Sequence, residues 1–468
     1  MESGGSDGRA ALKLCYCPVI ACRISVQAIC PLYCVSALDL DQGKFHNANV
    51  RTSSVRDATL SSFSRTSKGR QKVKYDLVFE GGGAKGMVFV GACEEFLARG
   101  HEAGRLLGTS AGAITAAMLA AGYSPRELLN LLTEKGPDNK SVFAGFMGPP
   151  APFTDEELRT GALHRLLEGI DFTFVPKVVQ DAARDMLPKS LASGGQSRHL
   201  VSLLERGGWF SADRFISWLS DKLDSGRYRE AARNFSRMTL QQFYDATATE
   251  LSVVASDVTD GRMLVLNHRT SPACPLVWAV RMSMSIPLVW NEVIWQSAWG
   301  AYLSRDINGH AIVDGGLLSN FPIELFLSDA PHVTKLMGPK GDNPVLGLLI
   351  DETLPVAKGL FVKVNLTLDD LPTLQRLKRL ANAATSAHDK MVMDEYSQLV
   401  VHLPAAGYGT VEFDMTDERR CALVNAGREA MASYFDTPAG LVLPGETKAT
   451  TCDSVLSRTD RIAARILS

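Results

Sequence analysis

The stretch 75-YDLVFEGGGAKGMVFVGACEEF-96 contains a predicted strand, a glycine turn and the start of a helix. Residues 75–79 form a short apolar run of the kind found in buried parallel strands. From Ala84 to Arg99 apolar residues recur at helical spacing, and Gly100 follows as a natural C-cap. The stretch therefore predicts one strand–turn–helix unit, from which α/β sheets are built.

A second unit follows at 106-LLGTSAGAITAAMLAAG-122. Its first two leucines predict a short strand, and 111–121 an Ala-rich helix. GTSAG at 108–112 lies between them, as in a nucleophile elbow, where small flanking residues allow a tight turn that exposes Ser110. GGSDG at 4–8 has the same G-x-S-x-G pattern but follows no strand and precedes no helix. Position therefore distinguishes the two motifs.

Further apolar runs predict strands later in the chain, at 250–258, 263–267, 311–314, 345–351 and 399–403. Strands that alternate with helices over this length predict an α/β fold, a three-layer sandwich with a mainly parallel central sheet. Capping boxes begin at Ser124 and Thr154, and residues 137–245 are predicted to form a mostly helical insertion.

GGGAKG at 81–86 also lies between a strand and a helix. Backbone N–H groups in such a turn can point at negative charge, as an oxyanion hole or a phosphate cradle requires. The motif formally satisfies the dinucleotide pattern G-x-G-x-x-G, so nucleotide binding stays open as an alternative. The acidic residue expected about 20 residues later is missing, however, since Glu102 precedes the second strand.

A third motif occurs at 311-AIVDGGLLSNFP-322, where Asp314 ends an apolar strand and two glycines turn the chain. An isolated DGG is commonly a turn in which the aspartate caps the next backbone groups. At a strand end, the carboxylate could reach the same sheet edge as Ser110 and assist proton transfer from a nucleophile.

The three motifs, in this order, resemble those of the patatin-like phospholipases, which are serine acyl hydrolases with a Ser-Asp dyad. The similarity extends to 277-VWAVRMSMSIPLVW-290 and 319-SNFP-322. It implies a patatin-like fold, Ser110 as the nucleophile and Asp314 as its partner, without a metal or a cofactor. The oxyanion region would comprise Gly82, Gly83 and Lys85, and the other motif positions are Gly81, Gly86, Gly108, Gly112, Gly315 and Gly316.

On this basis the chain is divided into four parts. Residues 1–72 are predicted to be a disordered or targeting extension, because their second half is polar and Ser/Thr-rich. The catalytic domain is expected at 73–330, its α/β continuation at 331–445, and a flexible tail at 446–468.

Two alternatives to the Ser-Asp dyad remain open. His332, His388 and His402 follow Asp314 in the order that a Ser-His-Asp esterase of the α/β-hydrolase type requires. A non-catalytic nucleotide- or lipid-binding module would use the same glycine turns without chemistry at Ser110.

Composition restricts the class of partner and the compartment. Lys plus Arg (49) nearly balance Asp plus Glu (51), so no nucleic-acid partner is predicted. Outside a cluster within residues 15–34 the cysteines are scattered, which favours a reduced, cytoplasmic protein. Residues 14–38 are too interrupted for a membrane span. Secretion through an N-terminal signal segment is the alternative, with an apolar run from Ile24 and small residues at 35–37.

Four of the six tryptophans, Trp278, Trp290, Trp295 and Trp299, fall within one short segment. They could be core residues, or they could line an acyl-chain channel or a membrane-facing rim. The expected substrate is a fatty-acyl ester of a phospholipid or a related glycerolipid, with peripheral membrane contact.

Overall fold

The structure is a computed structural model that describes residues 72–137, 139–168, 186, 188–357, 396–437 and 460. Apart from Lys72 and Asp460, the predicted N-terminal extension and tail lie outside the described residues, as does His388.

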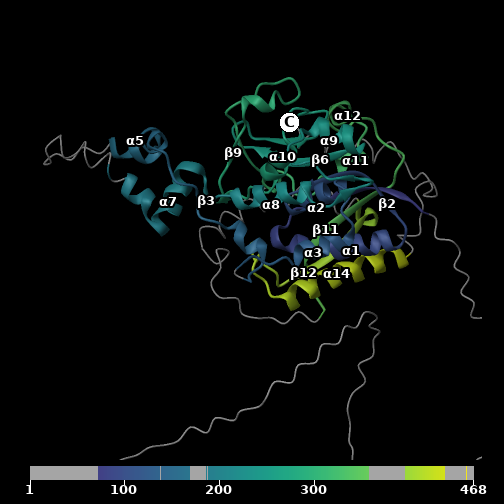
Figure 1. Ribbon diagram of the computed structural model, residues 1–468. Helices are drawn as coiled ribbons and strands as arrows, with labels where there is room; N and C mark the ends of the chain where they lie inside the picture. The colour runs from purple at the N-terminus through teal and green to yellow at the C-terminus, as the bar shows by residue number, and fades with distance from the viewer. Residues whose placement is uncertain are drawn as a thin grey trace, which may run out of the picture. The chain divides into compact units, whose positions relative to one another are not determined.

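A mainly parallel sheet forms the centre of the described chain, which confirms the predicted fold class (Figure 1). The strand order is β12-β11-β1-β2-β6-β10-β9, with β7 also paired to β6. The parallel strands are β1 (Lys74–Phe79), β2 (Glu102–Thr109), β6 (Leu251–Asp257), β11 (Val345–Pro355) and β12 (Val400–Ala406). The remaining strands form antiparallel pairs: β7 (Arg262–Leu266) and β10 (Ala311–Asp314) each pair with β6, and β9 (Val293–Ile294) pairs with β10.

Strand β2 begins earlier than the apolar run predicts. Its first four residues are exposed or half-buried, so they lack the apolar signal of a buried strand. A tertiary contact fixes them instead: buried Asp76 accepts hydrogen bonds from the Arg105 N–H (2.8 Å) and from Arg105 Nε (2.6 Å).

Alternate residues of the central strands enter two separate hydrophobic cores. Leu77, Leu106 and Val253 belong to the larger core, and their neighbours Val78 and Leu107 to the other. Successive side chains of a strand point to opposite faces of the sheet, so both faces are apolar and each is covered by helices. In Figure 1, α1 and α14 lie on one side of the sheet and α12 on the other.

The larger core is covered by α1 (Val88–Ala98), α2 (Ala111–Ala120), α3 (Pro125–Leu132), α8 (Asp213–Asp224), α9 (Leu240–Thr247), α10 (Leu276–Ser283) and α14 (Asp417–Asp436). The other core is covered by α11 (Glu324–Leu327) and α12 (Pro331–Met337). Short 3-10 helices occur at η1 (Gly83–Met87), η2 (Val142–Phe146), η3 (Ser297–Trp299), η4 (Gly315–Leu317) and η6 (Ser397–Leu399). No helix in the described ranges is long and apolar enough to cross a membrane.

The segment predicted to be a helical insertion contains short strands as well as helices. It includes α4 (Asp155–Thr160), α5 (Ala162–Glu168), α7 (Gly195–Arg206), β3 (Gly208–Phe210), β4 (Arg227–Tyr228) and β5 (Ala231–Ala232). β3 pairs in parallel with β8 (Leu288–Trp290), which ties α7 to the rest of the domain. Both predicted capping boxes form, at Ser124 and at Thr154.

Candidate active site

Strands β2 and β10 meet end to end along one edge of β6. β2 pairs with β6 as far as Thr109, opposite Val254, and β10 ends with Asp314 opposite Ala255, the next residue of β6. β7 occupies the other edge of β6 over this length. The structure thus brings Ser110 and Asp314 together, as expected, although the strand that carries Asp314 is antiparallel to β6.

Ser110 lies at the tight turn between β2 and α2. Its φ of 53° and ψ of −119° are unusual for a residue with a side chain, and such conformations occur at strained functional turns. The flanking glycines allow this turn. A Cβ on Gly108 would lie 2.4 Å from the Gly112 carbonyl, and one on Gly112 would lie 2.4 Å from the Phe79 oxygen.

Asp314 is a buried carboxyl group with one oxygen available. Oδ1 accepts a hydrogen bond from the Gly316 N–H (2.7 Å), whereas Oδ2 has no hydrogen-bond partner among the described residues. Burial raises the pKa of Asp314 to about 7, and its contacts with the Ser110 side chain and the Gly316 N–H oppose this rise. A carboxylate with this pKa can accept and return a proton near neutral pH.

The glycine turn after β1 packs directly against the nucleophile. A Cβ on Gly81 would lie 3.2 Å from the Ser110 Cβ and 2.3 Å from Asn320 Oδ1. Within the described chain, the N–H groups of Gly82 and Gly83 make no hydrogen bond, while that of Ala84 donates to the Thr410 oxygen (2.8 Å). An oxyanion hole requires backbone N–H groups of this kind, which have no hydrogen-bond acceptor and lie close to the reacting serine.

Lys85 was also predicted to belong to the oxyanion region. Its side chain is buried and its ammonium group pairs with Glu352, while its N–H donates to the Gly82 oxygen (3.2 Å). Lys85 does not line the pocket beside Ser110. Among the described residues, the contacts of the Lys85 ammonium group are directed to Glu352, and the role of Lys85 at the oxyanion stays a prediction.

An apolar pocket opens beside Ser110. Besides Ser110, Thr115 and two glycines, its lining side chains are apolar: Ala84, Met87, Val90, Ala111, Ile114, Met118, Leu128, Leu131, Leu132, Phe143, Phe146, Trp218, Met284, Ile286, Trp290 and Phe413. A site of this shape and composition suits a hydrocarbon chain next to a polar reacting group.

The tryptophan cluster divides between the two predicted roles. Trp290 lines the pocket. The Trp299 ring instead packs against Trp278 (5.4 Å between centroids) and Trp295 (5.6 Å), as core residues do. Sequence reasoning missed Phe143, Phe146, Trp218 and Phe413. The two phenylalanines of 142-VFAGF-146 were a signal that could have indicated part of this wall.

Of the three candidate triad histidines, the structure describes His332 and His402, and neither lines the pocket. His402 Nδ1 lies 3.0 Å from an Asp351 carboxylate oxygen, on neighbouring strands β12 and β11, and His332 lies on α12. Among the described residues, the lining of the pocket contains no histidine. Glu102 does not supply the acidic residue that the nucleotide-binding alternative requires either, because it pairs with Lys72 (2.6 Å) at the start of β2.

One group of potential metal ligands was found in the described part of the chain: Asp257, Asp260 and His310. His310 Nδ1 lies 2.8 Å from an Asp257 oxygen, and Asp260 is paired with Arg305 (2.5 Å). These contacts already engage side-chain atoms of all three residues, so the cluster gives no indication of a metal site.

Comparison with known proteins agrees with the geometry. A family model described as patatin-like phospholipase matches residues 77–327, more than half of the chain. The uncharacterized protein YqhO of Bacillus subtilis (strain 168) is 27% identical over 360 residues, which cover 75% of this chain and 95% of YqhO. The probable lipid hydrolase 463L of Invertebrate iridescent virus 6 is 20% identical over 256 residues, 54% of this chain and 64% of that protein.

Two solved structures are also similar. VipD from Legionella pneumophila matches 77% of this chain and 66% of its own, with 17% identity and a TM-score of 0.36. ExoU, in its complex with SpcU from the type III secretion system of Pseudomonas aeruginosa, matches 85% of this chain and 58% of its own, with 17% identity and a TM-score of 0.33.

Proposed function

This chain belongs to the patatin-like phospholipase family and is therefore a lipid hydrolase, and we propose that it cleaves fatty-acyl esters of phospholipids or related glycerolipids through a Ser110–Asp314 dyad. The observation that carries this proposal is the meeting of Ser110 and Asp314 beside an apolar pocket.

In the proposed reaction, Ser110 Oγ attacks the acyl carbonyl carbon while its proton passes to Asp314 Oδ2. The N–H groups of Gly82 and Gly83 stabilise the oxyanion, and Asp314 returns the proton to the departing alcohol as the ester bond breaks. Water then attacks the acyl-serine, again giving a proton to Asp314, and the fatty acid leaves as Ser110 is regenerated. The direct test is fatty-acid release from vesicles of defined phospholipids by the purified protein. A folded sample that releases none from any glycerolipid contradicts the proposal.

The pocket is proposed to hold the acyl chain, and Ile114 offers a test of this. It follows Ser110 by one helical turn of α2 and lines the pocket. Ile114→Trp is expected to fill part of the pocket and lower kcat/KM for a palmitoyl ester relative to a butyryl ester by about tenfold or more. Chain-length profiles with soluble esters measure this ratio. Ile294→Trp, at an exposed position of β9, is the matched control, and an equal shift in both variants contradicts the assignment.

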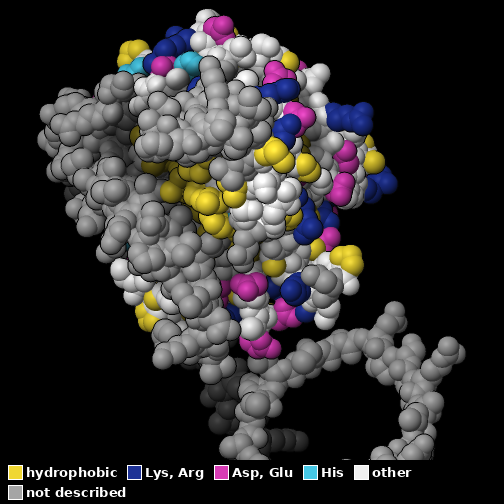
Figure 2. Space-filling view, turned by 90° about the vertical axis from the view of Figure 1, so that its left-hand side faces the viewer, with side chains coloured by type: hydrophobic (Ala, Val, Ile, Leu, Met, Phe, Trp, Pro, Cys, Tyr) yellow, Lys and Arg dark blue, Asp and Glu magenta, His cyan; other side chains and the backbone are white. Residues whose placement is uncertain are grey.

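Peripheral contact with a bilayer is proposed to occur through α7. Leu200 and Leu204 are four residues apart on this helix, and their side chains are 48% and 55% exposed. Figure 2 views the molecule from the side on which α5 and α7 lie in Figure 1, and hydrophobic side chains gather near the middle of that face. An amphipathic helix that exposes leucines suits the interface of a bilayer, where the substrate resides.

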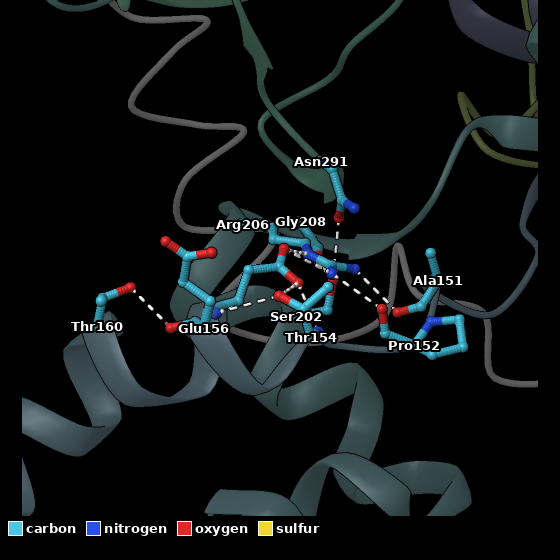
Figure 3. A network of polar contacts seen from close by, with 10 residues as sticks. Ala151, Pro152, Thr154, Glu156, Thr160, Ser202, Arg206, Gly208 and Asn291 are labelled. Atoms are coloured by element: carbon cyan, nitrogen blue, oxygen red, sulfur yellow. Dashed lines mark hydrogen bonds and ion pairs between the residues drawn. The ribbon is translucent and has the colours of Figure 1, made fainter.

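Polar contacts hold α7 against neighbouring segments (Figure 3). Arg206 donates to the Ala151 oxygen (2.9 Å) and pairs with Glu157 (2.8 Å). Ser202 donates to the Gly208 oxygen (2.7 Å), in the strand that pairs with β8 and hence with the pocket wall at Trp290. These contacts and the strand pairing therefore tie α7 to the wall of the pocket.

The double variant Leu200→Ser/Leu204→Ser is expected to weaken binding to phosphatidylcholine vesicles by about tenfold or more, since each leucine loses apolar burial in the interface. Sedimentation with vesicles measures binding, and hydrolysis of a soluble butyryl ester should not change. The control Val258→Ser/Ile294→Ser removes exposed apolar side chains elsewhere on the surface. Vesicle binding that is equally strong in both variants contradicts this contact.

A further inference from the structure

The segment Ser283–Met284–Ser285, at the end of α10, contacts both residues of the dyad through their backbone amides. Ser283 Oγ accepts a hydrogen bond from the Ser110 N–H (2.9 Å), and the Ser285 carbonyl accepts one from the Asp314 N–H (2.9 Å). Met284, between them, lines the apolar pocket. Three consecutive residues thus touch the nucleophile, its partner and the pocket.

Ser283 is well suited to fix the position of Ser110. It is fully buried, and its hydroxyl donates to the Val254 oxygen (2.6 Å) while accepting from Ser110. Val254 lies opposite Thr109 in the sheet, so Ser283 joins β6 to the residue that follows β2. Both ends of this bridge are backbone groups, which leaves the hydroxyl little freedom to move.

The strained turn gives this hydrogen bond its importance. Ser110 has a positive φ, which the surrounding structure must maintain against the preference of a residue with a side chain. Its N–H lies at the start of α2, where no helical acceptor exists. The Ser283 hydroxyl supplies that acceptor and thereby holds the turn in one conformation.

Arg281 in turn fixes the segment Ser283–Met284–Ser285. The buried Arg281 guanidinium donates to Ser285 Oγ and to the Asn291 oxygen (2.7 Å), and Ser285 Oγ donates to the Arg281 oxygen (2.7 Å). Burial lowers the pKa of Arg281 to about 10, so the group remains charged at neutral pH. A rigid support of this kind keeps a positioning residue in place.

We propose that Ser283 is a positioning residue that holds the Ser110 hydroxyl in its reactive orientation. This rests on the proposed function, because it assigns Ser110 as the nucleophile. The role is not catalytic, since Ser283 contacts the backbone of Ser110 and does not line the pocket proposed to hold the acyl chain. Loss of its hydroxyl should lower the reactivity of Ser110 more than it lowers binding of the acyl chain.

Ser283→Ala is expected to lower kcat for a soluble butyryl ester and the rate of fluorophosphonate labelling by about 10–100-fold, with KM changed by less than about twofold. Ser283→Thr, which keeps the hydroxyl, should restore most of the rate. The matched control is Ser202→Ala, which removes an equally buried serine hydroxyl that also donates to a backbone carbonyl, on α7. It should lower thermal stability without lowering the labelling rate.

A labelling rate in folded Ser283→Ala equal to that of the wild type overturns the proposal, as does an equal loss of rate in Ser202→Ala. If Ser283→Ala does not fold, Ser283→Cys takes its place, because a thiol keeps the volume but accepts hydrogen bonds weakly. Ser110→Ala separates the two proposals. Retained lipid hydrolysis in that variant contradicts the dyad itself. If Ser110→Ala is inactive but the Ser283 variants keep wild-type rates, only the role of Ser283 is contradicted.

Discussion

Replacing Ser110 with alanine is expected to lower fatty-acid release from phospholipid by at least about 10³-fold and to abolish covalent labelling by a fluorophosphonate. The reason is that Ser110 supplies the one oxygen proposed to bond to the acyl carbon. It sits at the strained turn after β2, with Asp314 and the apolar pocket beside it. Labelling of the purified protein and a fatty-acid assay measure the two effects on the same samples.

The chain contains its own control for this experiment. Ser6 lies in GGSDG, which has the same G-x-S-x-G pattern as GTSAG around Ser110. Ser6→Ala should therefore label and hydrolyse like the wild type. If Ser110→Ala keeps its label, the nucleophile is another residue. If the wild type and Ser6→Ala both fail to label while lipid still binds, the lipid-binding alternative is favoured over the enzyme.

Local sequence signals predicted the strand–turn–helix units because each depends on only a few neighbouring residues. The apolar run at 75–79, the glycine turns and the two capping boxes all appear where they were expected. The start of β2 could not be predicted in this way. Its first residues are held by the contact between Asp76 and Arg105, which are 29 positions apart.

The direction of β10 is a second feature that periodicity could not give. The apolar run 311–314 predicts a strand, but its antiparallel pairing depends on β6 and β9. The pocket is a third, since Phe146, Trp218 and Phe413 come from three separate segments that only the packed structure brings together. The proposed role of Ser283 likewise depends on a contact with Ser110 across 173 positions.

Replacing Asp314 with asparagine is expected to lower kcat/KM by at least about 10³-fold, because an amide cannot accept the serine proton. The same group should set the pH dependence of the wild type. Burial raises the pKa of Asp314 to about 7, and only its ionised form accepts a proton. Activity on a soluble ester should therefore be constant above about pH 7 and fall about tenfold per pH unit below it.

The residual activity of Asp314→Asn should not fall in this way below about pH 7. An unchanged fall in activity at acidic pH would show that another group titrates.

The rival base would be a histidine, and the protein offers suitable controls. His402 is engaged with Asp351 at β12, and His332 lies on α12, away from the lining of the pocket. His332→Ala, His388→Ala and His402→Ala should each keep wild-type activity and its pH limb. A loss comparable to that of Asp314→Asn in any one of them would favour a Ser-His-Asp triad, because a dyad needs no imidazole to carry the proton.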